Sequence, residues 1–133
     1  MNDRLVLDIE DIQIIVHKTE DANFIFNNPK RLFDGFVMIT SGVGYAINAD
    51  DKKYNISAGD IIFANKNDKY SIAFEGVGSY VASGLTLNAD KKILPFIHRC
   101  TEGQYKKIKD ICKKWLSRSW DSYAACRIGL MDF

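Results

Sequence analysis

The sequence predicts a mainly β domain, a small sandwich or barrel, followed by two α-helices. The first observation is that short apolar runs alternate with turn signals at nearly even spacing between residues 31 and 87. Short strands with a turn about every eight to twelve residues are typical of all-β sandwiches and barrels. The second observation is that the apolar period becomes helical near residue 100.

The predicted strands are bounded by glycine, asparagine or aspartate. In chain order they cover residues 11–17, 23–27, 36–40, 45–49, 54–56, 61–64, 70–74 and 79–87. Closing such strands into a barrel would remove the exposed edges that invite aggregation. Residues 1–10 alternate only weakly, so we expect them to form an N-terminal arm.

The two helices are predicted after residue 100. Thr101 and Gln104 have the spacing of a capping box, with a hydroxyl at the N-cap and an amide three residues later. Apolar residues then recur at helical spacing, at Tyr105, Ile108, Ile111, Cys112, Trp115 and Leu116. A second amphipathic segment follows and reaches Phe133 without a stop signal, so we expect this chain to be one half of a longer protein.

Length and composition limit the function classes. The 133 residues fit one domain, and a net charge of +1 gives no overall field that would attract nucleic acid or an acidic membrane. No run approaches the ~18 apolar residues of a membrane span, and the N-terminus lacks a signal-peptide pattern, so we expect a cytoplasmic protein. Cys100, Cys112 and Cys126 are odd in number and widely spaced, which argues against a disulfide framework or a zinc site.

The order of these signals resembles the cupin-like sensor domain of AraC/XylS-family transcriptional regulators. The resemblance is carried by Arg31, the strand 36–39, Gly42-Val43-Gly44, the hairpin around Asp50, Ala58-Gly59-Asp60, the segment 94–99, Trp115 and Tyr123-Ala124-Ala125-Cys126. It implies a cupin-like double-stranded β-helix (jelly-roll) barrel over residues 11–99 and a helical dimerisation or linker segment over residues 100–133. The family's DNA-binding part, two helix-turn-helix units, has no counterpart in these residues.

The metal ligands of metallo-cupins are not matched. Counting from Gly59, the positions of the second cupin motif hold Asn65, Asn67 and, in place of the histidine, Tyr70. Residues 27–41 contain neither the histidines nor the glutamate of the first motif. Iron and zinc sites need at least about three such ligands. We therefore expect no metal and no other cofactor.

The candidate ligand-binding residues are Arg31, Met38, Tyr70, Tyr80 and Ala82. Tyr70 could hydrogen-bond a ligand, or it could simply plug the barrel mouth. Tyr80 shares a strand face with Ala82, and we expect this face to point inward and to leave room for a ligand. Arg31 could bind carboxylate, phosphate or sugar hydroxyls at the mouth, or be a surface charge. The expected effector is a small polar metabolite, with a sugar favoured.

The resemblance implies a non-enzymatic sensor that forms a homodimer and meets DNA only through the part not present here. We expect Ile108, Ile111 and Trp115 at the dimer contact, with packing onto the chain's own barrel as the competing account. The alternative function is a stand-alone, metal-free cupin isomerase or lyase acting on a small sugar or acid. Such an enzyme needs an acid–base pair in the barrel, for which residues 61–87 offer only Asp68 and Glu75. A third possibility is a structural module whose barrel is filled.

Overall fold

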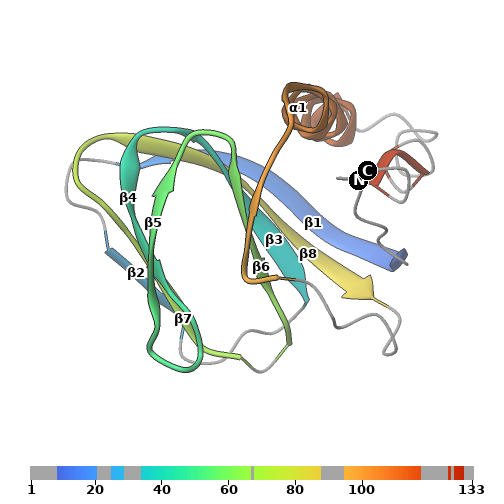
Figure 1. Cartoon of the computed structure of the whole chain (residues 1–133). Helices are drawn as coiled ribbons and strands as arrows, with labels where there is room; N and C mark the ends of the chain where they lie inside the picture. Colours follow the sequence, from blue (N-terminus) through green and yellow to red (C-terminus); the bar gives the residue numbers. More distant parts are fainter. Residues whose placement is uncertain are drawn as a thin grey trace.

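Two antiparallel sheets face each other (Figure 1). Buried apolar side chains lie between them. The computed structural model describes residues 9–20, 25–28, 34–66, 68–87, 95–117, 126 and 128–130. The strands are β1 (Ile9–Glu20), β2 (Ile25–Asn28), β3 (Gly35–Ser41), β4 (Val43–Ile47), β5 (Lys53–Ser57), β6 (Asp60–Ala64), β7 (Tyr70–Phe74), β8 (Gly78–Leu87) and β9 (Ile97–Arg99). The helix α1 spans Glu102–Ser117.

The strand order identifies the architecture. One sheet runs β1-β8-β3-β6-β9 and the other β2-β7-β4-β5, and every paired strand is antiparallel. The first eight strands thus make two interlocked Greek keys, which is the jelly roll. The predicted fold class, a mainly β cupin-like jelly roll followed by helical structure, is confirmed. The sequence analysis did not predict β9, which lies within the segment 94–99.

The boundaries of the described strands differ from the predicted ones by a few residues. The first strand is the largest difference, because β1 begins at Ile9 and continues to Glu20. Residues 9 and 10 therefore belong to the strand, and residues 1–8 of the predicted arm lie outside the described part of the chain. The strands β6, β7 and β8 agree with the prediction to within one residue at each end.

Alternation along β3 divides the core into two layers. Val37 and Ile39 point between the two sheets, whereas Phe36 and Met38 point to the opposite face. The same division holds along β6, where all five residues are buried. The large sheet is therefore apolar on both faces, and its outer face must be covered by another element.

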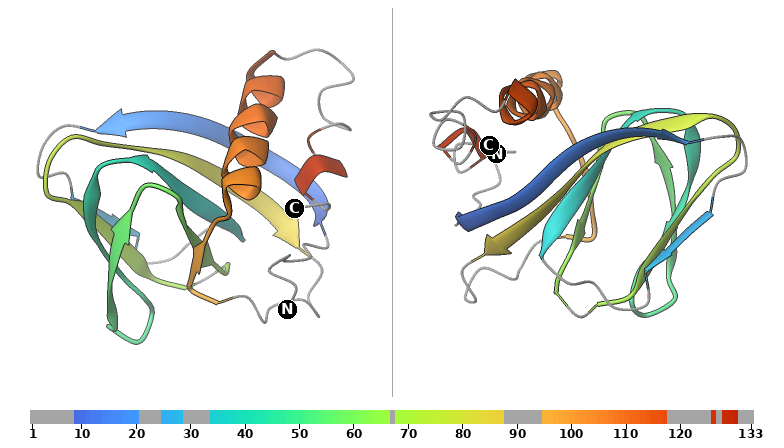
Figure 2. Two further views of the ribbon diagram at one scale, coloured as in Figure 1. Left: turned by 45° about the horizontal axis from the view of Figure 1, so that its top comes forward. Right: turned by 180° about the vertical axis from the view of Figure 1, so that it is seen from behind.

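That cover is α1, which crosses the outer face of β1 and β8 (Figure 2). Its start is a capping box, as predicted: the Gln104 N–H donates to Thr101 Oγ1 over 3.1 Å and the Thr101 N–H donates to Gln104 Oε1 over 3.0 Å. Ile108 and Ile111 face the sheet, and Cys126 and Leu130, which are helical, pack on the same cluster. Burying one such aliphatic side chain contributes about 1.5–3 kcal/mol.

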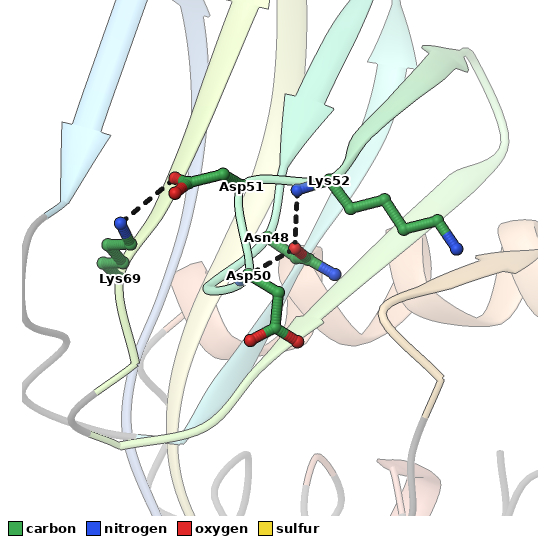
Figure 3. Close-up of polar contacts among 5 residues, drawn as sticks. All are labelled: Asn48, Asp50, Asp51, Lys52 and Lys69. Atoms are coloured by element: carbon green, nitrogen blue, oxygen red, sulfur yellow. Dashed lines mark hydrogen bonds and ion pairs between the residues drawn. The ribbon is translucent and has the colours of Figure 1, made fainter.

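The β4–β5 hairpin is held by Asn48 (Figure 3). Its Oδ1 accepts hydrogen bonds from the backbone N–H groups of Asp50 and Lys52, at 2.9 and 3.0 Å. Asp51 adopts a left-handed conformation with φ 63°, which an aspartate tolerates in a tight turn. Lys69 pairs with the Asp51 carboxylate at 3.1 Å and ties the hairpin to the residues before β7.

The turn between β5 and β6 gives the Ala58-Gly59-Asp60 step its physical basis. Gly59 has φ +95°, a conformation that suits glycine. Asp60 Oδ2 accepts the Ser57 N–H at 2.8 Å, and its Oδ1 lies 3.1 Å from Arg99 Nη1. The aspartate therefore closes the turn and fastens β9 to the sheet edge.

Candidate ligand-binding site in the barrel

The layer between the two sheets is the candidate site, and its surface is almost wholly apolar. Its buried members are Val37, Ile39, Ala46, Ile56, Ile62, Ala64, Tyr70, Ile72 and Phe74, with Tyr80, Ala82, Phe96 and Ile97 packed against them. Among these hydrophobic residues, only the two tyrosines carry side-chain polar atoms. This lining can hold an apolar body and offers a small number of hydrogen bonds, a composition common in small-molecule sites.

Tyr70 and Tyr80 enter this layer from the two facing sheets, on β7 and β8 respectively. Tyr70 is 6% exposed, and Tyr80 is partly buried. The Tyr80 ring stacks on Phe74 with centroids 6.3 Å apart and planes inclined by 17°. The predicted inward orientation of Tyr70, Tyr80 and Ala82 is confirmed; their contact with a ligand stays a prediction.

The Tyr80 hydroxyl makes a polar contact that the sequence did not suggest. It donates a hydrogen bond to Oε1 of Glu20 at 3.0 Å. Burial raises the pKa of Tyr80 above its usual range, and the Glu20 hydrogen bond and charge raise it further, with a contribution from Tyr70. The phenol therefore keeps its proton and acts as a hydrogen-bond donor.

Three small residues line the interior. Ala46, Ala64 and Ala82 belong to three different strands, and all three lie in the interior layer. Phe96, from the segment before β9, also packs there, with its ring centroid 5.5 Å from that of Tyr54. Sequence reasoning missed Phe96, although its apolar side chain beside a proline was a usable signal.

Met38 does not line the interior, so this part of the prediction is wrong. The side chain is fully buried in the outer cluster, together with Ile61, Val81 and Ile108. The reason is strand alternation: once Val37 and Ile39 point between the sheets, Met38 must point the other way. Arg31, the predicted mouth residue, lies outside the described residues, and its role stays a prediction.

Two of the three residues predicted at the dimer contact are buried within their own chain. Ile108 and Ile111 are 1% and 3% exposed within one chain, and Trp115 packs against the same cluster. Their partner is the outer face of β1, β3, β6 and β8 in the same molecule. The sequence could not decide this, because the apolar outer face of the large sheet forms only when these strands come together. For Ile108 and Ile111 the burial agrees with the competing account, packing onto the chain's own barrel; a homodimer, and a part for Trp115 in it, stay predictions.

The ionisable residues of the described chain are dispersed. Among these residues, no three His, Cys, Asp or Glu side chains gather as a metal site. His98 Nε2 lies 3.0 Å from Gln104 Oε1 at the start of α1, and since an amide oxygen only accepts, the histidine donates. Asp68 and Glu75 are exposed. Within the described part of the chain, no helix is both long and apolar enough to cross a membrane.

The chain has no match among family models or curated proteins. Its fold is similar to solved structures. ToxT from Vibrio cholerae O395, bound to (E)-4-(8-methylnaphthalen-1-yl)but-3-enoic acid, superposes with a TM-score of 0.61 at 14% identity, covering 90% of this chain and 54% of ToxT. Unsaturated fatty acid bound wild-type ToxT from strain SCE256 gives 0.61 at 10% identity, covering 94% and 54%.

A conserved SPY1581 protein of unknown function from Streptococcus pyogenes is also similar, with a TM-score of 0.51 at 15% identity over 60% of this chain and 68% of that one. The chain spans about half the length of ToxT. At these identities the likeness shows a shared fold, and with ToxT it covers 90% and 94% of the present chain in the two superpositions.

Proposed function

We propose that this domain is the ligand-sensing part of an AraC/XylS-type transcriptional regulator and that it works by binding, without catalysis. The observation that carries the proposal is the interior layer of the jelly roll, an apolar surface with two inward phenols and three alanines. Support also comes from the sequence resemblance and from the fold shared with ToxT.

The ligand proposed is a mainly apolar molecule with one polar head, such as a fatty acid. A sugar, which the sequence favoured, presents many hydroxyl groups, and each one buried without a partner costs free energy. Among the hydrophobic residues of the described interior, only Tyr70 and Tyr80 carry side-chain hydrogen-bonding groups. The two ToxT ligands named above are carboxylic acids with apolar bodies. We assign the carboxylate to Arg31 on its sequence position and to the Tyr80 hydroxyl.

The proposed output is a change in packing between the barrel and the elements attached to it. A ligand shifts such an equilibrium only through different affinities for the two arrangements. We place the protein in the cytoplasm, where its three free cysteines would stay reduced. A homodimer, and contact with DNA through a further domain, belong to the proposal, with a dimer surface other than the buried face of α1.

A metal-free isomerase or lyase is the competing function. It would need a group that loses and regains a proton near neutral pH. The carboxylate–phenol pair of Glu20 and Tyr80 is close enough, but the raised pKa of Tyr80 keeps the phenol protonated. Asp68 and Glu75 are exposed in turns. Binding is therefore better supported than catalysis.

The test is a thermal-shift and calorimetric screen of the purified chain. Palmitoleic and oleic acids are compared with arabinose and gluconic acid, with the fatty acids held below their critical micelle concentrations. A ligand at about 100 times its Kd should add about 2.7 kcal/mol to the free energy of unfolding. We expect the fatty acids to do so, and arabinose and gluconic acid to have no such effect at the same micromolar concentrations.

Matched variants locate the binding. Ala82→Trp fills the interior and should abolish the fatty-acid shift, whereas Ala58→Trp makes the same change at an exposed position and should leave it intact. A far-ultraviolet circular dichroism spectrum checks that both variants fold. A folded Ala82→Trp that binds oleic acid normally, or a screen without any interior ligand, contradicts the proposal.

A further inference from the structure

A pocket lies on the outward side of the small sheet, away from the barrel interior. Its volume is about 330 Å³, and it is lined by Val43, Gly44, Asn55, Ile56, Ser57 and Glu75. These residues come from β4, β5 and the turn after β7. The site does not rest on the function proposed above, because the interior ligand would occupy the other face of these strands.

Strand pairing explains how the pocket forms. Val43 is paired with Ser57, and the Glu75 N–H donates to the Val43 carbonyl at 3.0 Å, so that Ser57, Val43 and Glu75 form one row across three segments. Gly44 is paired with Ile56 in the next row. Ile56 points into the barrel core and Gly44 has no side chain, so backbone forms the floor between the outward side chains.

The polar side chains around this floor have donors and acceptors that are free to bind a ligand. Among the described residues, neither the Asn55 amide nor the Glu75 carboxylate has a side-chain hydrogen bond or ion pair. Ser57 Oγ accepts a hydrogen bond from Arg99 Nη1 at 3.1 Å, so its own proton can be donated elsewhere. Arg99 is itself held by Asp60, at 3.1 Å, and does not neutralise Glu75.

We infer that this pocket binds a neutral polyol of monosaccharide size. Glu75 can only accept, Ser57 can donate, and Asn55 can do both. Neighbouring hydroxyl groups of a sugar each donate and accept, and they satisfy this set. Val43, 54% exposed, supplies an apolar wall for a C–H face of the ring. The Glu75 charge disfavours anions. Because the pocket is open to solvent, the Kd should lie in the millimolar range.

The experiment is a titration of the full, uniformly ¹⁵N-labelled chain with glucose, galactose and arabinose, followed by amide chemical shifts. At least one sugar should give saturable shifts at Val43, Asn55, Ser57 and Glu75, with little change at Ile72, which faces the interior. Glu75→Ala and Asn55→Ala should each weaken binding by tenfold or more. Glu102→Ala removes another exposed carboxylate, on α1, and should leave the affinity unchanged.

Four outcomes would overturn the inference. They are the absence of saturable shifts for all three sugars, sugar-induced shifts confined to the interior, unchanged affinity in folded Glu75→Ala, and preferential binding of ethanolamine or acetate. The Ala82→Trp variant keeps the two sites apart: it should lose the fatty acid and keep the sugar titration. The outer pocket and the interior site can therefore fail independently.

Discussion

The hydroxyl of Tyr80, on β8, donates a 3.0 Å hydrogen bond to the Glu20 carboxylate at the end of β1. In the β1–β8 register Glu20 lies opposite Gly78 and Lys18 opposite Tyr80, so the contact is diagonal across the strand pair. It connects a side chain of the interior layer with the last residue of the first strand. A ligand that hydrogen-bonds Tyr80 would compete with Glu20, which gives interior occupancy a direct effect on β1.

Removing this hydroxyl should change how stability depends on pH. The pKa of the Tyr80 phenol is raised in the folded chain. As the pH rises, the phenol therefore ionises in the unfolded chain, near pH 10, before it does so in the folded chain. Tyr80 therefore contributes stability below that pH, and the contribution is lost as the pH rises further. Urea unfolding between pH 8 and 11 should show a steeper loss for the natural chain than for Tyr80→Phe. Parallel curves would mean that the phenol titrates alike in both states.

A charged residue introduced on the buried face of α1 should unfold the domain. It should not yield a folded monomer. Ile111→Glu places a carboxylate at a position that is 3% exposed and surrounded by apolar side chains. We expect a loss of about 4 kcal/mol or more in the free energy of unfolding. Lys113→Glu, on the exposed side of the same helix, should change it by less than about 0.5 kcal/mol. Circular dichroism with sedimentation distinguishes unfolding from dissociation, and a well-folded Ile111→Glu monomer would contradict the packing described here.

Gly44 should be irreplaceable, in contrast to Gly76. A Cβ at Gly44 would lie 1.9 Å from the carbonyl oxygen of Ala73, a backbone atom that cannot move without opening the β4–β7 pair. At Gly76 a Cβ meets nothing within 4 Å. Gly44→Ala should cost about 3 kcal/mol or more, whereas Gly76→Ala should be neutral or stabilise by up to about 1 kcal/mol. Chemical unfolding of both variants provides the comparison, and equal effects would refute it.

The Asp60 carboxylate should matter more for the turn than for the ion pair. Asp60→Ala leaves the Ser57 N–H without its acceptor in a largely buried place, at a cost of about 1–3 kcal/mol. Asp60→Asn keeps an acceptor oxygen and loses only the charge opposite Arg99, whose side chain is 64% exposed, so about 0–1 kcal/mol is expected. If the asparagine variant is as unstable as the alanine variant, the ion pair dominates.

Local signals in the sequence predicted much of this molecule. Alternating apolar runs and their turn residues predicted the strands, and Thr101 with Gln104 predicted the start of α1, because strand periodicity and capping depend on residues a few positions apart. The sequence also predicted that Tyr80 and Ala82 share a face. It could not assign faces across the sheets: Met38 was expected inside the barrel and lies outside it.

What the sequence by itself determined is the set of elements and the alternation of faces within each one. Only the tertiary structure decided which face is interior, that α1 covers its own sheet, and that Glu20 meets Tyr80 across 60 positions of the chain. The physical reason is that β6 and its neighbours are apolar on both faces. Either face of such a strand can be buried, and the choice depends on how distant segments pack against it.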